Sequence, residues 1–190
     1  MDPKAIHERL VGKFGEKVTG AVLEGPSPWA VVAGEAILEV ASYLKSEPDL
    51  GFDNLMCLSA VDLPKENPPR MEVVYHLFSY KNRHRFALKV HVPRENAEIP
   101  TVESVWGVAN FHEREAFDMF GIRFAGHSDL RRILLPDDWE GFPLRKDWVD
   151  PEFYNGMRVK PTQQMADRAK AGEAIGVGPF DFTPPNRHVS

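Results

Sequence analysis

The sequence contains one cysteine, Cys57, among 190 residues. A single thiol forms no internal disulfide bond and supplies too few ligands for a zinc or iron–sulfur site. Because Cys57 stands between Met56 and Leu58, we expect it to pack in the hydrophobic core; a catalytic thiol is the alternative. Cysteine usage therefore points to no metal cluster held by this chain.

Long hydrophobic runs and nucleotide-binding motifs are also missing. No apolar stretch approaches the ~20 residues of a membrane-spanning helix. The first ten residues contain acidic side chains and no apolar centre, so they do not resemble a targeting peptide. There is no GxGxxG, P-loop lysine or CxxC motif, and the seven histidines show no HExxH spacing. We expect an intracellular chain that binds no nucleotide, flavin or metal itself and reaches a membrane only through partners.

Positive charge is in deficit. Lysine and arginine number 23 against 28 aspartate and glutamate residues, for a formal net charge of −5. A non-specific nucleic-acid binder needs a net basic footprint, so this class is excluded. The hydrophobic content of 43% is ordinary for a globular protein, and the length suits one domain with some additional chain.

Periodic patterns predict a mixed fold. Helical spacing of apolar residues predicts helices at 3–14 and 35–45 and a third that opens at Thr101 and runs to about residue 120. Strands are expected at 18–23, 29–33, 55–63, 71–80 and 84–92, the last two as a hairpin around residues 81–83. This order predicts an α+β fold: a two-layer domain with helices on one face of a mixed sheet, followed by an extended C-terminal arm.

The predicted domain organisation has three parts. Residues 1–122 form the α+β domain, and residues 123–160 form an extended partner-binding arm. Residues 161–190, rich in proline and glycine, form an irregular or partly disordered tail in which only residues 162–173 suit a short helix.

Charged side chains crowd between residues 113 and 132. Glu113 falls within an apolar helical stripe, so it must be paired or hydrogen-bonded; Arg123, Arg131 and Arg132 are the candidate partners. Arg114 and Asp118, four residues apart, can pair on the flank of the helix. A general acid–base pair or metal ligands are the alternative for the carboxylates. Helical geometry opposes it, because Glu113 and Glu115 lie about 200° apart around the axis.

Basic pairs and aromatic residues follow the cluster. Arg131–Arg132 and Arg145–Lys146 are candidate phosphate sites, but nearby Asp129 and Asp147 favour ion pairs with protein groups. Trp139, Trp148, Phe142 and Phe153 are typical anchors of permanent interfaces. For His127 a polar packing role is preferred to metal binding.

These residues together resemble one family. Glu113-Arg114-Glu115, Asp118-Met119-Phe120-Gly121, Gly126-His127, Asp129-Leu130-Arg131-Arg132 and Gly141-Phe142-Pro143-Leu144-Arg145-Lys146-Asp147 stand in register over about 35 residues. The pattern resembles that of the 30-kilodalton subunit of respiratory complex I, which is the C-type subunit of the bacterial NADH–quinone oxidoreductase. Ser128 replaces a usual proline and Phe111 a frequent tryptophan, and we expect only local adjustment from either.

The resemblance implies a non-catalytic scaffold subunit of the peripheral arm, on the cytoplasmic side of the cell (inner) membrane. Its partners would be the 49-kilodalton (D-type) quinone-site subunit and the cluster-bearing subunits. FMN, iron–sulfur clusters and quinone would belong to partner subunits. No catalytic, cofactor-binding or metal residue is expected. The expected structural and interface residues are Glu113, Arg114, Glu115, Asp118, His127, Asp129, Arg131, Arg132, Trp139, Arg145, Lys146 and Asp147.

Two alternatives remain open at this level. The same scaffold occurs in related hydrogenase-type and F420H2-dependent membrane complexes, so the electron donor is not decided. A free-standing soluble enzyme that uses the acidic cluster is the alternative from another class.

Overall fold

The computed structural model describes residues 1–158, and contacts divide the chain into two compact units, Met1–Trp148 and Val149–Ser190. Within the second unit the described residues form a short antiparallel hairpin of β8 (Phe153–Tyr154) and β9 (Met157–Arg158). The predicted tail, residues 161–190, and its short helix at 162–173 lie outside the described residues.

The first unit contains the elements that the sequence pattern predicts, with small shifts at their ends. The helices are α1 (Pro3–Phe14), α2 (Ile37–Ser46) and α3 (Ala109–Phe120), with short 3-10 turns at Gly15–Lys17 and Gly34–Ala36. The strands are β1 (Val18–Val22), β2 (Trp29–Val32), β3 (Asn54–Leu63), β4 (Arg70–Ser79), β5 (His84–Pro93), β6 (Glu98–Pro100) and β7 (Arg123–Ala125).

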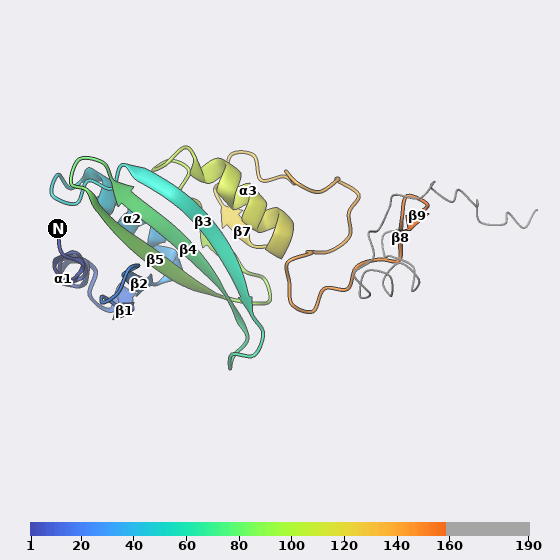
Figure 1. Ribbon diagram of the computed structural model, residues 1–190, viewed down its shortest axis with the longest axis horizontal. Helices are drawn as coiled ribbons and strands as arrows, with labels where there is room; N and C mark the ends of the chain where they lie inside the picture. Colours follow the sequence, from blue (N-terminus) through green and yellow to red (C-terminus); the bar gives the residue numbers. More distant parts are fainter. Residues whose placement is uncertain (159–190) are drawn as a thin grey trace, which may run out of the picture. The chain divides into compact units, whose positions relative to one another are not determined.

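Five of these strands form one mixed sheet in the order β1-β2-β5-β4-β3 (Figure 1). Strands β2 and β5 run parallel, and the other neighbours run antiparallel. The register of the hairpin pairs Met71 with Val92 and Ser79 with His84. The parallel pair needs a long crossover, which α2, β3 and β4 supply between β2 and β5.

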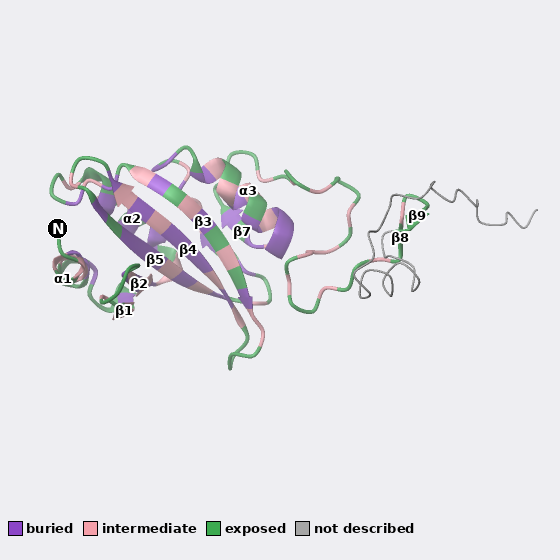
Figure 2. Cartoon of the chain, in the orientation of Figure 1, coloured by how far each residue is buried: buried purple, intermediate pink, exposed green. Residues whose placement is uncertain are grey.

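The helices cover one face of this sheet. Buried residues of all three helices join the inward-facing strand residues in a single hydrophobic core, and Figure 1 shows α2 behind the sheet. Along β4 and β5 the inward positions are buried while most outward positions are only half-buried or exposed (Figure 2). The α+β fold class, with helices on one face of a mixed sheet, is therefore confirmed.

The third helix begins later than predicted. α3 starts at Ala109, and residues 101–108 form turns instead of its first two turns. Thr101 and Val102 leave the helical path because their hydroxyl and amide donate to the Glu113 carboxylate. The segment before them forms β6, which pairs in parallel with β7. This small second sheet has strands of three residues each, too short for an alternating pattern to reveal.

The compact first unit also runs past residue 122, where the sequence pattern placed a boundary. β7 pairs with β6 inside this unit, and the chain stays within it up to Trp148. Between Gly126 and Glu152 the structure has turns and bends but no helix or strand. Residues 123–148, the first part of the expected arm, are therefore integrated in the first unit.

The core position predicted for Cys57 is wrong. β3 has a register irregularity between Leu55 and Cys57, which leaves Met56 exposed and Cys57 half-buried. The Cys57 side chain therefore faces outward, where its Sγ lies 3.2 Å from the Ser59 hydroxyl. An extra residue in a strand reverses the inward and outward positions, and nothing in the run of apolar letters signals it.

Gly121 is required at the end of α3. It adopts φ of +77°, and a Cβ there would lie 2.6 Å from the Phe142 ring. We expect Gly121→Ala to lower the free energy of unfolding by about 1–3 kcal/mol, through left-handed strain and displacement of Phe142. Gly12→Ala in α1 is the matched control: no atom lies within 4 Å of its Cβ, so it should stabilise by about 0.5–1 kcal/mol. Equal effects in urea unfolding would contradict this assignment.

Candidate functional site: the anchored loop

Residues 126–148 follow β7 and form what we term the anchored loop. A segment without helix or strand must satisfy its backbone amides elsewhere. In this loop, carboxylates of the folded domain accept several of them: Glu103 binds Ser128, Asp118 binds residues 133–135, and Asp62 binds Lys146. The three acids bind the loop near its start, its middle and its end, so the loop has a defined path without regular secondary structure.

Asp118 is the central anchor. Its side chain is fully buried near the end of α3, and one oxygen accepts from the amides of Ile133, Leu134 and Leu135 at 3.0, 2.7 and 2.9 Å. The other oxygen accepts from Arg132 Nη1 at 2.7 Å. Burial alone would raise the pKa of this carboxyl, but the amide and guanidinium donors outweigh burial and lower the pKa.

Arg132 extends this anchor along the loop. Its Nη2 donates to the carbonyl oxygens of Trp139 and Gly141, at 2.9 and 3.2 Å. One guanidinium thus joins α3 to two turns of the loop in the fixed fork geometry that arginine provides. The indoles of Trp139 and Trp148 lie 6.4 Å apart, and Gly141, with φ of +79°, leaves room for Trp148.

The last turn of α3 binds the loop through its free carbonyls. Leu144 N donates to Met119 O at 3.1 Å, and Arg145 Nε donates to Phe120 O at 2.7 Å. The Arg145 guanidinium also lies 4.7 Å from the centre of the Phe142 ring. These donors satisfy groups that every helix leaves unpaired at its C-terminus. Arg145 therefore caps the C-terminus of α3, whereas the sequence pattern favoured an ion pair between Arg145 and an acidic protein group.

Asp62 and Arg94 hold the end of the loop. Arg94 donates to both oxygens of the buried Asp62 carboxylate, at 2.8 and 3.0 Å, and also pairs with Asp147. The Lys146 amide donates to Asp62 at 2.8 Å. Arg94, followed by the Lys146 amide, lowers the pKa of Asp62. Sequence reasoning missed Asp62 and Arg94. The signal that could have revealed Asp62 was a carboxylate between Val61 and Leu63 in a mainly apolar strand.

Ser128, one of the two departures from the family pattern, has a specific function here. Its amide and hydroxyl donate to Glu103 at 3.0 and 2.7 Å, and Asn110 Nδ2 donates to the same carboxylate at 2.9 Å. The Ser128 hydroxyl, its amide and Asn110 lower the pKa of Glu103 to about 2. Proline at this position would have neither donor.

Glu113 is buried as predicted, but none of the three candidate arginines is its partner. It accepts hydrogen bonds from Thr101 Oγ1 and from Val102 N, the latter at 2.8 Å, and His127 Nε2 lies 3.9 Å away. Burial is the largest influence on Glu113 and raises its pKa despite these donors. The buried His127 ring bridges the Asn110 carbonyl and the Asp129 amide, at 3.1 and 3.0 Å.

The predicted pair of Arg114 with Asp118 is also wrong. Arg114 donates to the carbonyl oxygens of Arg131 and Arg132, at 3.2 and 3.1 Å, because Asp118 turns inward to the loop amides. Arg131 is 71% exposed and pairs with Asp129. Glu115 is exposed, as expected from its position on the helix. Each buried carboxylate of α3 therefore has its own donors, and the three acids do not share a site.

Apolar side chains project from the anchored loop and the outer side of α3. Leu134 is 61% exposed although its own amide is bound to Asp118. Other exposed apolar residues of this region are Val108, Phe111, Ile133 and Leu144. Large apolar groups on a backbone that is already ordered are typical of surfaces that contact another macromolecule.

The opposite pKa shifts predict opposite pH dependences. Asp118 has a lowered pKa, so its contribution to stability is present above the unfolded-state pKa and disappears as pH falls through the lower folded-state pKa. Glu113 has a raised pKa, so folding favours its protonated form and stability decreases as pH rises through that value.

We therefore expect the stability advantage of wild type over Asp118→Asn to shrink below about pH 4, near the unfolded-state value for aspartate. The difference between the stabilities of wild type and Glu113→Gln should instead shift in favour of wild type as pH falls from neutral towards the unfolded-state pKa of glutamate, because the folded-state pKa of Glu113 is raised. Urea unfolding at several pH values measures both differences. Parallel pH profiles for the two variants would contradict the assigned shifts.

Two other kinds of site are absent from residues 1–158. No group of three histidine, cysteine or acidic side chains in this range is placed to hold a metal ion. No helix in the same range has the length and apolar character of a bilayer span.

The fold and the site define a class of protein: an α+β domain with a long irregular loop held by its buried acids. The model of the family "Respiratory-chain NADH dehydrogenase, 30 Kd subunit" matches residues 30–153, which include the large sheet apart from β1 and the first residue of β2, and the whole anchored loop. The chain belongs to this family, whose members are subunits of an NADH–quinone oxidoreductase complex.

Curated relatives agree with this assignment. The C-type subunit of the NADH-quinone oxidoreductase of Roseiflexus sp. (strain RS-1) is 46% identical over 148 residues, which cover 77% of this chain and 84% of the relative. The corresponding C-type subunit of Chlorobium phaeobacteroides is 44% identical over 157 residues, covering 82% and 93%.

Solved structures share the fold. A trypsin-resistant fragment (1-134) of Nqo5 is 34% identical with a TM-score of 0.58, covering 68% of this chain and all of the fragment. A chain of an archaeal membrane-bound sulfane sulfur reductase has a TM-score of 0.64 at 22% identity, covering 98% of both chains. At that identity the second likeness shows the fold alone.

Proposed function

We propose that the chain is a non-catalytic scaffold subunit in the peripheral arm of a proton-translocating NADH–quinone oxidoreductase. In this proposal FMN, iron–sulfur clusters and quinone are bound by partner subunits, and the chain contributes assembly and rigidity. The observation that carries the proposal is the anchored loop. Buried carboxylates fix an irregular backbone, which then presents exposed apolar residues such as Leu134 and Leu144.

The proposed partner of this loop is the 49-kilodalton, quinone-site subunit, with cluster-bearing subunits beside it. Pre-ordering supports a permanent contact, because the loop loses little conformational entropy on binding. The exposed Arg131–Asp129 pair and Lys146 would form a polar rim around Leu134 and Leu144. The chain would reach the cytoplasmic side of the cell membrane only through these partners.

A tagged pull-down from gently solubilised native membranes, analysed by mass spectrometry, tests the proposal. We expect the 49-kilodalton homologue together with the flavin- and cluster-bearing, NADH-oxidising subunits. A chain recovered alone, or catalytic activity of the purified chain by itself, would contradict the scaffold function and favour the free-standing enzyme.

The same experiment decides the electron donor. The fold likeness to a sulfane sulfur reductase chain shows that this architecture occurs in a respiratory membrane complex of another type. Recovery with hydrogenase-type or F420H2-oxidising subunits would keep the scaffold function and replace NADH as donor.

A further inference from the structure

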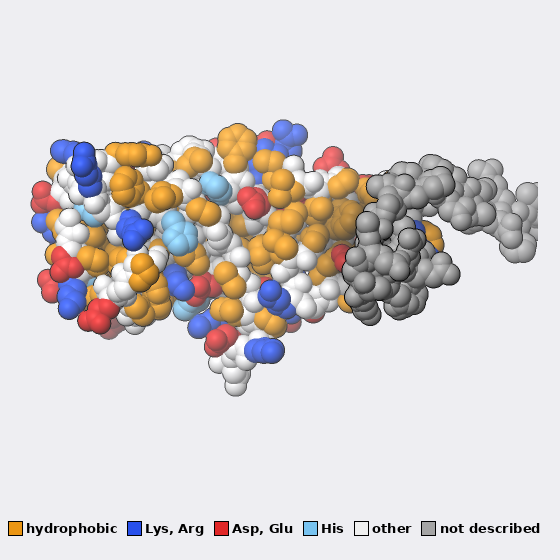
Figure 3. Space-filling view, in the orientation of Figure 1, with side chains coloured by type: hydrophobic (Ala, Val, Ile, Leu, Met, Phe, Trp, Pro, Cys, Tyr) orange, Lys and Arg blue, Asp and Glu red, His pale blue; other side chains and the backbone are white. Residues whose placement is uncertain are grey.

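The face of the sheet that carries no helix is more apolar than a solvated face. Outward positions of β2, β4 and β5 include Trp29, Val74, Phe78 and Ala87, and Val74 and Ala87 are buried even without a covering layer. An antiparallel sheet with one solvated face normally alternates to polar residues on that side. Figure 3 shows hydrophobic and histidine side chains gathered on this side of the molecule.

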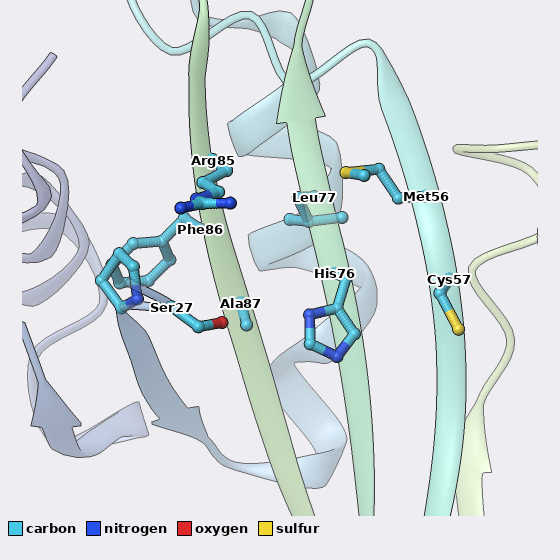
Figure 4. Close-up of a pocket in the computed structure, with 9 residues that line it drawn as sticks. Ser27, Met56, Cys57, His76, Leu77, Arg85, Phe86 and Ala87 are labelled. Carbon is cyan, nitrogen blue, oxygen red and sulfur yellow. The ribbon is translucent and has the colours of Figure 1, made fainter. Parts of the chain in front are cut away.

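A hollow of about 380 Å³ lies on this open face. Met56 and Cys57 of β3, His76 of β4, and Arg85 and Ala87 of β5 line it, with Ser27 and Pro28 at one side. Figure 4 shows Met56, Cys57, His76 and Arg85 on the side of the sheet opposite α2. The irregularity in β3 that exposes Met56 and turns Cys57 outward forms one wall of this hollow.

The hollow and the adjoining end of the β4–β5 hairpin carry residue types that are frequent in protein interfaces. Met56 and Tyr80 are 57% and 67% exposed, and Phe78 contacts Tyr80 edge-to-face at 5.1 Å. Arg85 stands directly opposite Phe78 in the hairpin and is exposed. Methionine, tyrosine and arginine are enriched in interface centres relative to other surfaces.

Charge identifies the kind of partner. Glu72 lies on the open face at the end of β4 away from Arg85, and it is already bound by Lys89 at 2.8 Å and His91 at 3.0 Å. Within residues 1–158, Arg85 forms no ion pair, so its guanidinium is free to bind an external acid. The chain as a whole carries a net charge of −5, which makes this cationic, apolar position distinct from the general surface.

We propose that the open sheet face is a second docking surface, which takes a protein segment of a partner subunit. This segment inserts an apolar side chain into the hollow and places a neighbouring carboxylate on Arg85. A small-molecule ligand fits less well, because ligand sites enclose most of their ligand and this hollow lies on an open sheet. The proposal rests on the proposed function only in placing the partner in the same assembly.

Site-specific photo-crosslinking in the assembled, membrane-derived complex tests the proposal. In the test variant a photoreactive residue replaces Met56. In a second variant it replaces Leu134 and reports on the anchored loop. In the control variant it replaces Val11, which is 39% exposed on α1. We expect position 56 to crosslink to a partner segment with an apolar residue beside aspartate or glutamate. Three outcomes would overturn the proposal: the absence of a crosslink from position 56, a crosslink to a second copy of this chain, or a crosslink to a segment that contains no aspartate or glutamate.

Charge reversal gives an independent measurement. When Arg85→Glu and wild-type chains with different tags compete for assembly, we expect the variant to be incorporated at least about tenfold less. Reversing the acid of the crosslinked segment to arginine should restore incorporation. Unchanged incorporation of Arg85→Glu would overturn the proposal. If only the crosslink from position 134 were missing, the result would contradict the loop interface and leave the second docking surface supported. The two proposals are therefore tested independently.

Discussion

Asp118→Ala should release the anchored loop and lower the free energy of unfolding of the Met1–Trp148 unit by about 3–5 kcal/mol. Asp118 accepts from three consecutive loop amides and from Arg132, and all of these donors lose their acceptor together. The guanidinium of Arg132, whose side chain is only 16% exposed, keeps its positive charge without a compensating carboxylate. An unpaired buried charge is the costliest consequence of such a substitution.

Amide hydrogen exchange reports where this energy is lost. In Asp118→Ala we expect faster exchange at residues 133–135 and in the turns that Arg132 holds at Trp139 and Gly141. The strands β4 and β5 should keep their relative order of protection, because they do not contact this carboxylate directly.

Glu115→Ala is the matched control for Asp118→Ala. Glu115 lies on the same helix and is exposed, so its removal should change stability by no more than about 0.5 kcal/mol. If both alanine variants showed equal stability and equal exchange in the loop, Asp118 would not be its anchor.

Leu134→Glu should leave the folded domain intact and reduce incorporation into the complex by at least about 30-fold, the equivalent of a 2 kcal/mol interface residue. The Leu134 side chain points away from the core and is 61% exposed, so the charge costs little in the free chain. In the proposed interface the same carboxylate would be buried without a partner.

Competition between tagged wild-type and variant chains during assembly measures this effect, and urea unfolding of the purified chain verifies its stability. Val11→Glu introduces the same charge at an exposed apolar position of α1 and should not change incorporation. Equal incorporation of both variants would show that the anchored loop lies outside the interface.

The sheet and its helices could be predicted because their signals are local. Alternation in β4 and β5 and the proline-started helix α1 express their structures within a few residues. The start of α3 could not be predicted in this way. Whether Thr101 extends a helix or turns to bind Glu113 depends on a side chain twelve residues later.

The partners of the charged residues were mostly not predictable. Helical spacing placed Glu113 inside and Glu115 outside, which the structure confirms. It could not reveal that Arg132 reaches Asp118, or that Arg94 binds Asp62 from 32 positions away. Such pairs depend on chain segments that only the folded domain brings together.

The sequence by itself determined the fold class, the family and the stretch where charge and aromatic residues gather. Each of these is carried by periodicity or by residues in fixed register. Only the tertiary structure decided that acids of the domain bind loop amides, and that Cys57 and Met56 face the open side of the sheet. The physical reason is that backbone amides carry no sequence signal, and a single strand irregularity reverses which face a side chain occupies.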